Sequence, residues 1–202
     1  MSRGTASNSQ RGFHMNPTTP ASLRGQPLTI HNKIQRDSVT FLRRTDGQLS
    51  TLVRVELAPG GGNPPHRHSA YAETFTARQG TLGLHLDGRE LRLQSGETVT
   101  APIGSVHRFY NPTDEPVVFE VEIQPGHRGF ERGLIVLYGL ANDDRTDMQG
   151  RPRHPLHLGL FSSLTDTRLI GPLATLNPVM TALGWLARVT GTQRRLLARY
   201  DR

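Results

Sequence analysis

Two glycine-flanked motifs near the middle of this chain constrain its fold more than any other feature. The first spans residues 60–80, and the second spans residues 96–111, about fifteen residues further on. Together they contain three histidines and one glutamate: His66, His68, Glu73 and His107. Three imidazoles and one carboxylate suit a divalent transition metal better than calcium or magnesium, which prefer oxygen ligands. The motifs therefore predict a metal site.

The spacing of these residues predicts how they meet. Residues two apart on a strand point to the same face, so His66 and His68 can converge on one ion. Glu73 lies at an odd offset from His68 and would face the wrong way on one unbroken strand. We therefore expect a bend within residues 69–72, with Glu73 on the next strand and His107 on a later one. Four ligands from three strands imply a small closed sheet around one cavity.

Both motifs resemble the two signature motifs of the cupin superfamily, over roughly residues 38–126. The match includes the flanking residues Gly60, Gly80, Gly96, Pro102, Gly104 and Asn111. The resemblance implies a mainly β fold, a double-stranded β-helix (jelly-roll) barrel. It also implies that one divalent transition metal ion (Fe, Mn, Ni, Zn or Cu) is bound by His66, His68, Glu73 and His107. Because only one pair of motifs is present, a single barrel is expected.

Short β-rich runs between turn residues predict about eight barrel strands. Two Asp-Gly turns, at residues 45–48 and 87–89, are typical of hairpins. The strands are expected at residues 38–44, 50–57, 74–77, 81–86, 90–93, 97–101, 106–110 and 117–123.

After Pro125 the apolar residues recur at helical spacing. Helices are expected at residues 130–141, 155–164, 177–189 and 194–200, the third capped by Asn177 and the last separated by a break at Gly191. The chain is thus divided into a disordered tail (1–27), a cupin β-barrel domain (28–126) and a helical C-terminal extension (127–202).

The extension is expected to dock on its own barrel or on a second subunit. Val179, Leu183 and Leu186 would form one apolar face, and apolar helix faces beside a barrel are usually buried. Dimerisation, which is common among cupins, would provide cover, so we expect a homodimer. Contact of the C-terminal basic helix with a membrane surface is the less favoured alternative.

Composition narrows the function classes. The net charge of +7 lies in the two ends, with +5 in residues 1–36 and +4 in residues 188–202, which leaves −2 for the rest. No nucleic-acid-binding motif accompanies this charge, so no specific nucleic-acid partner is expected. The chain has no cysteine, which excludes disulfides and thiol chemistry. Without an apolar leader or membrane span, a cytoplasmic protein is expected, and Met15 is an alternative start.

Four further residues are candidates for the substrate pocket. Phe75 and Phe109 share the strand parity of Glu73 and His107 and should point inward. Tyr71, in the bend, is placed at the cavity mouth or packed beside it. Arg54 either points inward to pair with a substrate carboxylate or lies outside in an ion pair.

An open metal position beside a partly apolar pocket favours chemistry on a small organic molecule. Non-haem, metal-dependent oxygenation, of the kind a dioxygenase performs, is the first expectation. The alternatives are a metal-dependent isomerase or decarboxylase, and a binding or sensor barrel without turnover. The sequence does not decide between enzyme and binder, because one fold hosts many activities.

Overall fold

The computed structural model describes residue 1 and residues 27–45 and 49–201. The expected N-terminal tail therefore lies outside the described residues, apart from its first and last residue, and so does Met15. The tip of the expected turn at residues 45–48 also lies outside them.

The β part of the chain consists of two main antiparallel sheets and one short strand pair. The larger sheet has the order β1-β2-β3-β10-β5-β8, the smaller has the order β7-β6-β9, and β4 pairs with β11. This is the expected jelly-roll arrangement, in which neighbours in a sheet are often distant in sequence. The bounds are β1 (Leu28–Asn32), β2 (Asp37–Arg43), β3 (Thr51–Leu57), β4 (Arg67–His68), β5 (Ala72–Gln79), β6 (Leu82–Leu86), β7 (Arg89–Leu93), β8 (Thr98–Ala101), β9 (His107–Tyr110), β10 (Val117–Gln124) and β11 (Thr167–Arg168).

Each of the eight expected strands is present, with ends shifted by at most two residues. The strands alternate between buried and exposed positions because one face of the sheet covers the core. Along β3, for example, Val53, Val55 and Leu57 are buried, whereas Arg54 and Glu56 are exposed. The strands that the sequence missed are β1 at the sheet edge and the two-residue strand β11, whereas β4 corresponds to the strand expected around His66 and His68.

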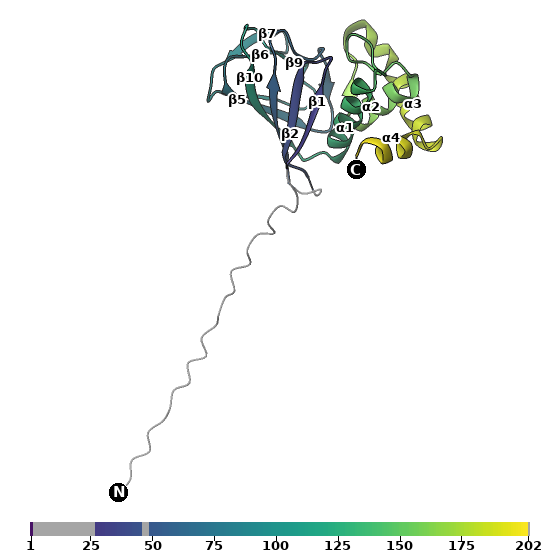
Figure 1. Cartoon of the computed structure of the whole chain (residues 1–202), viewed down its shortest axis with the longest axis horizontal. Helices are drawn as coiled ribbons and strands as arrows, with labels where there is room; N and C mark the ends of the chain where they lie inside the picture. Colours follow the sequence, from purple (N-terminus) through teal and green to yellow (C-terminus); the bar gives the residue numbers. More distant parts are fainter. Residues whose placement is uncertain (2–26, 46–48, 202) are drawn as a thin grey trace.

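The C-terminal region folds into four α-helices, which gather beside the strands (Figure 1). They are α1 (Arg128–Asn142), α2 (Pro155–Leu164), α3 (Asn177–Val189) and α4 (Thr192–Tyr200), with a 3₁₀ turn η1 (Gly171–Leu176) before α3. Gly191 adopts a positive φ between α3 and α4 and ends α3, as expected. The cap at Asn177 was wrongly predicted: Asn177 bonds both backbone groups of Leu169 instead, and Leu176 caps α3 without a side-chain bond.

Helix α1 joins the helical region to the barrel through apolar packing and one buried carboxylate. Ile135, Leu137 and Tyr138 belong to the same buried cluster as the strand residues. Glu131 is 1% exposed and accepts hydrogen bonds from the Thr45 amide (2.6 Å) and the Thr51 hydroxyl (2.7 Å). A buried carboxylate is stable only when it is well paired. Glu131 therefore fixes the start of α1 against the barrel.

The outer helices pack on α1 and α2 around a second apolar cluster. It is formed by Val136, Leu140, Leu160, Leu164, Ala187 and Leu196. The predicted apolar face of α3 is only partly covered by this packing. Leu183 lies against α2, but Val179 and Leu186 are 49% and 39% exposed, and Trp185 and Val189 are more exposed still. Among the described helices, none is long and apolar enough to cross a membrane.

The close contact between α2 and α3 depends on two glycines and gives a test of how the extension docks. A Cβ added to Gly159 would lie 2.4 Å from the Leu183 Cβ and 2.8 Å from the Gly184 nitrogen. Alanine should favour an isolated helix over glycine by about 1 kcal/mol. We nevertheless expect Gly159→Ala to lower the melting temperature, because overpacking costs about 1–3 kcal/mol. Calorimetry measures this effect, with Ala182→Val on the exposed side of α3 as a control. An unchanged or higher melting temperature for Gly159→Ala would contradict this packing.

Candidate metal centre

The four predicted ligands meet where several strands begin or end. His66 and His107 form an antiparallel bridge in which each backbone amide donates to the other's carbonyl, at 3.0 and 2.9 Å. His68 lies on β4, and Glu73 follows at the start of β5 after a bend at Ser69 and Ala70. The chain thus turns between the ligands, as the odd spacing of Glu73 required.

The candidate ligand atoms of His66, His68, Glu73 and His107 all lie within 4.8 Å of one another. The His107 Nε2 is 3.1 Å from the Glu73 Oε2, and the His68 Nε2 is 3.6 Å from the Glu73 Oε1. The ring centroid of His66 lies 4.7 Å from the ring centroid of His68 and 4.6 Å from that of His107. The structure therefore brings four donors around one small volume.

Hydrogen bonds behind the imidazoles orient each ring toward that volume. The Nδ1 of His66 lies 2.9 Å from the Pro64 carbonyl, and the Nδ1 of His107 lies 3.2 Å from the Ser105 carbonyl. A carbonyl only accepts, so both Nδ1 atoms carry the proton and leave the Nε2 lone pair free.

His68 is oriented in the same way through a tyrosine. The Tyr71 hydroxyl donates to the Thr165 carbonyl (2.6 Å) and lies 2.9 Å from the His68 Nδ1. Because its only proton is used on Thr165, the tyrosine oxygen must accept from the His68 Nδ1–H. The lone pair of His68 is then on Nε2, which is buried without a hydrogen-bond partner among the described residues. A hydrogen-bond partner on the Nδ1 of a ligating histidine, as Tyr71 is for His68, is typical of metal sites.

The electrostatics of the cluster favour the form that a metal needs at three of the four donors, His66, His68 and Glu73. Burial, together with the neighbouring imidazoles, lowers the pKa of His66 to about 3, and burial also lowers the pKa of His68. Burial would raise the pKa of Glu73, but the hydrogen bond and charges of the histidines outweigh it and lower this pKa to about 2. For His107, burial is outweighed by Glu73, which raises its pKa. Neutral imidazoles and an ionised carboxylate are the forms that bind a divalent metal.

The donor set thus fits a resident divalent transition metal. Three imidazole nitrogens are borderline donors and suit such metals, and one carboxylate oxygen adds a hard donor. The unpartnered His68 Nε2 is a buried polar atom that a metal would satisfy. An ion that takes six ligands would keep two positions open beside these four protein donors, and an open position is what distinguishes catalytic from structural sites.

A cavity of about 160 Å³ lies directly beside the cluster. His66, His68 and Glu73 line one part of it, and the inner faces of β2, β3 and β10 form one wall. The other wall comes from the helical extension, through Phe130, Leu134, Leu137, Leu158 and Phe161. Helices α1 and α2 therefore complete the cavity that the barrel alone would leave open, and they make it largely apolar.

The four predicted pocket residues have different positions. Phe109 lines the cavity. Phe75 is fully buried and packs beneath it, 6.3 Å from Phe109 and 6.0 Å from His107 between ring centroids. Tyr71 is not at the cavity mouth, because its hydroxyl is held between His68 and Thr165. Arg54 takes the outward position and pairs with Glu120 at 2.8 Å, so its assignment to the pocket is wrong.

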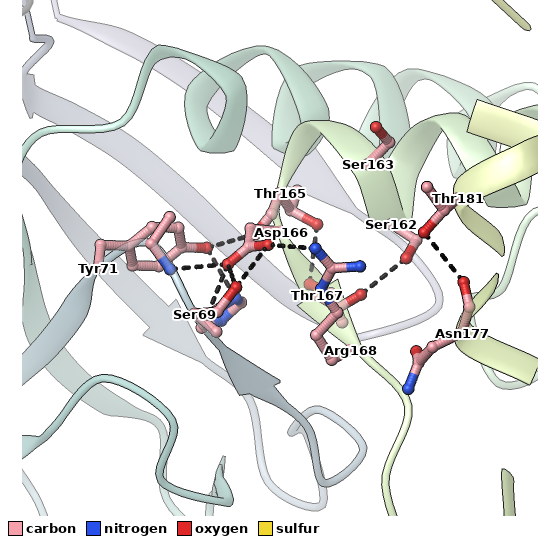
Figure 2. A network of polar contacts seen from close by, with 12 residues as sticks. Ser69, Tyr71, Ser162, Ser163, Thr165, Asp166, Thr167, Arg168, Asn177 and Thr181 are labelled. Carbon is pink, nitrogen blue, oxygen red and sulfur yellow. Dashed lines mark hydrogen bonds and ion pairs between the residues drawn. The ribbon is translucent and has the colours of Figure 1, made fainter. Parts of the chain in front are cut away.

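The sequence did not reveal a network that holds the bend between the ligands (Figure 2). Asp166, in the turn that follows α2, accepts from the amides of Ser69 (2.5 Å) and Ala70 (2.8 Å) and pairs with Arg168 at 3.1 Å. Next to it, Thr167 pairs with His68 between β11 and β4. Nothing in the sequence signals a contact across almost a hundred residues.

The sequence also missed Asp37, which opens β2 and lines the cavity. It shares the inward face of β2 with Val39 and Phe41, and Tyr138 of α1 donates to its Oδ2 at 2.6 Å. Burial raises the pKa of Asp37 to about 6, against the Tyr138 hydrogen bond, which lowers it. An acid that shares the parity of the two buried apolar positions after it is a signal that the sequence carries.

Parts of this chain are similar to known proteins. The family description "Cupin domain" matches residues 53–130. The probable oxidoreductase virH of Hypocrea virens is 34% identical over 115 residues, which cover 51% of this chain and 52% of that protein. An uncharacterized protein of Aquifex aeolicus is 35% identical over 96 residues, 48% of this chain and 75% of the relative. Among solved structures, a cupin-2 domain protein of Rhodospirillum rubrum, Rru_A2000, is 20% identical with a TM-score of 0.45, over 55% of this chain and 79% of that one.

The chain belongs to the cupin superfamily. It spans about half the length of the oxidoreductase that it matches.

The contact between Tyr71 and His68 gives a test of the site geometry. Tyr71→Phe removes the hydroxyl that fixes the tautomer and orientation of His68. We expect metal affinity to fall about 10–100-fold, the usual effect of losing such a partner. Competition with a chelator of known affinity measures this change. Tyr110→Phe, which removes a hydroxyl bonded to the exposed Glu90, should leave the affinity unchanged. Equal affinities for both variants and the wild type would contradict this role.

Asp37 makes stability depend on pH in a defined window. Its folded pKa of about 6 lies above the ordinary value of 3.8, so the folded state loses relative stability as pH rises from about 4 to about 6. Asp37→Asn lacks this penalty. Its free energy of unfolding, relative to that of the wild type, should therefore increase by up to about 3 kcal/mol between about pH 4 and about pH 6. Denaturant unfolding with chelator present, at several pH values, measures the difference, with the exposed Asp114→Asn as control. If the stability difference between Asp37→Asn and the wild type does not change with pH, the pKa of Asp37 is not raised in the folded state.

Proposed function

We propose that this chain is a metal-dependent enzyme that oxidises a small organic molecule with O₂ in the cavity beside the histidine cluster. The proposal rests on one observation: the four metal donors border a largely apolar cavity of about 160 Å³. The similarity to a probable oxidoreductase supports the same reaction class.

In this proposal His66, His68, Glu73 and His107 hold one ion, such as Fe or Mn. A redox-active metal, when bound, supplies the electron transfer that lets O₂ react with an organic molecule. The protein's own part is to bind and orient the substrate. Phe109 and the apolar side chains of α1 and α2 exclude water and pack against the substrate body, so that its oxygen atoms lie next to the cluster.

We propose that the two parts of the chain have different roles at the site. We take residues 28–126 as the barrel that carries the donors and residues 127–202 as an extension that completes the cavity. The contacts of α1 with the barrel and the contribution of α1 and α2 to the cavity support this division.

We also propose that the chain forms a homodimer through the outer face of α3. Trp185 and Val189 are 61% and 59% exposed, and a second copy would cover this apolar surface. Binding of anionic vesicles by a monomer would favour the membrane-surface alternative instead.

A cytoplasmic location is a proposal that rests on the sequence alone, and cell fractionation tests it.

Oxygen consumption tests the proposed activity. Protein loaded with iron(II) should consume O₂ when given a member of a panel of phenolic and dicarbonyl compounds, with equivalent loss of that compound. His66→Ala should reduce the rate to background because it removes a metal donor that faces the cavity, whereas His85→Ala, on β6 and outside the cluster, should not. Binding without turnover would favour the sensor alternative. Conversion without O₂ uptake would favour an isomerase or decarboxylase.

A further inference from the structure

We propose that Asp37 is a ligand-binding residue at the far end of the cavity from the histidine cluster, where it accepts a hydrogen bond from a hydroxyl or protonated amine of an elongated, otherwise apolar substrate. This inference rests on the proposed function, because it places the other end of the same molecule at the metal site.

The strand register places Asp37 and the metal cluster at opposite ends of the sheet. Asp37 is level with Leu57, at the end of β3. Glu73 is level with Ile123 of β10, which is level with Thr51 at the start of β3. Six residues of strand correspond to roughly 20 Å, a gap that side chains from both ends shorten. Both Asp37 and Glu73 line the one cavity, which is therefore elongated.

The carboxylate of Asp37 has an unused acceptor. Asp37 is 8% exposed, and its Oδ1 has no hydrogen-bond partner among the described residues. Tyr138 donates to Oδ2 only. A buried carboxylate oxygen without a donor is costly, so its presence in a cavity needs an explanation.

Two polar side chains that line the cavity make hydrogen bonds with residues other than Asp37. Arg151 directs its Nε to Asp147 (2.7 Å) and its Nη2 to Gln149 (3.2 Å). The Gln35 side-chain oxygen accepts from Asn32 at 3.0 Å. Around Asp37 the inward residues of β2 and β3 are Val39 and Val55. No described side chain supplies the missing donor, and a bound molecule in the cavity would.

A structural role alone does not account for this arrangement. Attaching α1 to the barrel requires only the bond between the Tyr138 hydroxyl and Oδ2, and an asparagine could accept it equally well. The Oδ1 of Asp37 has no hydrogen-bond partner among the described residues, and Asp37 carries a negative charge above its pKa of about 6. Both suit recognition of a hydrogen-bond donor, and a protonated amine most of all.

Matched pairs of small molecules test this inference on the full chain. The probes are catechols whose two oxygens can bind the metal and which carry an alkyl chain of increasing length. Each alkyl probe is compared with counterparts of the same number of non-hydrogen atoms that end in a hydroxyl or an amine. Affinities are measured by calorimetry on nickel(II)-loaded protein without O₂. At the chain length that reaches Asp37, the hydroxyl and amine probes should bind about tenfold more tightly than the alkyl probe, or better.

Two variants connect that preference to Asp37. The double variant Asp37→Leu/Tyr138→Phe removes both polar partners and should abolish the preference, whereas Tyr138→Phe alone should keep it. If the double variant does not fold, as judged by circular dichroism, the matched pairs on the wild type still decide. Equal affinities of the alkyl, hydroxyl and amine probes at every length would overturn the role of Asp37 while leaving the metal site intact. If none of the catechols binds, the proposed function fails, and this inference fails with it.

Discussion

The convergence of three imidazoles and one carboxylate on a single small volume is the constraint on which the rest of the structure depends. Each histidine turns its Nε2 inward because its Nδ1 is held from behind by a carbonyl or by Tyr71. The lowered pKa values of His66, His68 and Glu73 keep these donors ready for a cation. In the absence of a cation such a buried group of polar atoms is costly, so it is better understood as a binding site than as part of a stable core.

The helical extension supports this site as well as covering it. Thr165 and Asp166 hold Tyr71 and the bend at Ser69, and Thr167 pairs with the backbone of His68. The same region supplies the apolar wall of the cavity through α1 and α2. A change that loosens the helices should therefore affect metal binding and substrate binding together, although none of the four donors lies in the extension.

Local patterns in the sequence predicted the strands and the residues of the cluster, and the resemblance to cupins implied the barrel. The alternation along β3 and the odd spacing of Glu73 are short-range signals that follow from strand geometry. The contacts that support the cluster were not predictable, because Thr165 and Asp166 reach Tyr71 and the bend from a distant part of the chain. Of the two positions open to Arg54, the structure shows the outward one, where it pairs with Glu120. Asn177 was misjudged because a tertiary contact with Leu169 replaced its expected helix cap.

The most direct test of this account is the metal content of protein purified without chelators. The wild type should contain close to one divalent transition metal ion per chain, since the four donors form one site. His107→Ala removes the donor that holds Glu73 and should lose most of that metal, whereas His85→Ala should keep it. Full metal content in His107→Ala, with the ion still bound at its wild-type affinity, would contradict the assignment of this cluster as the metal centre.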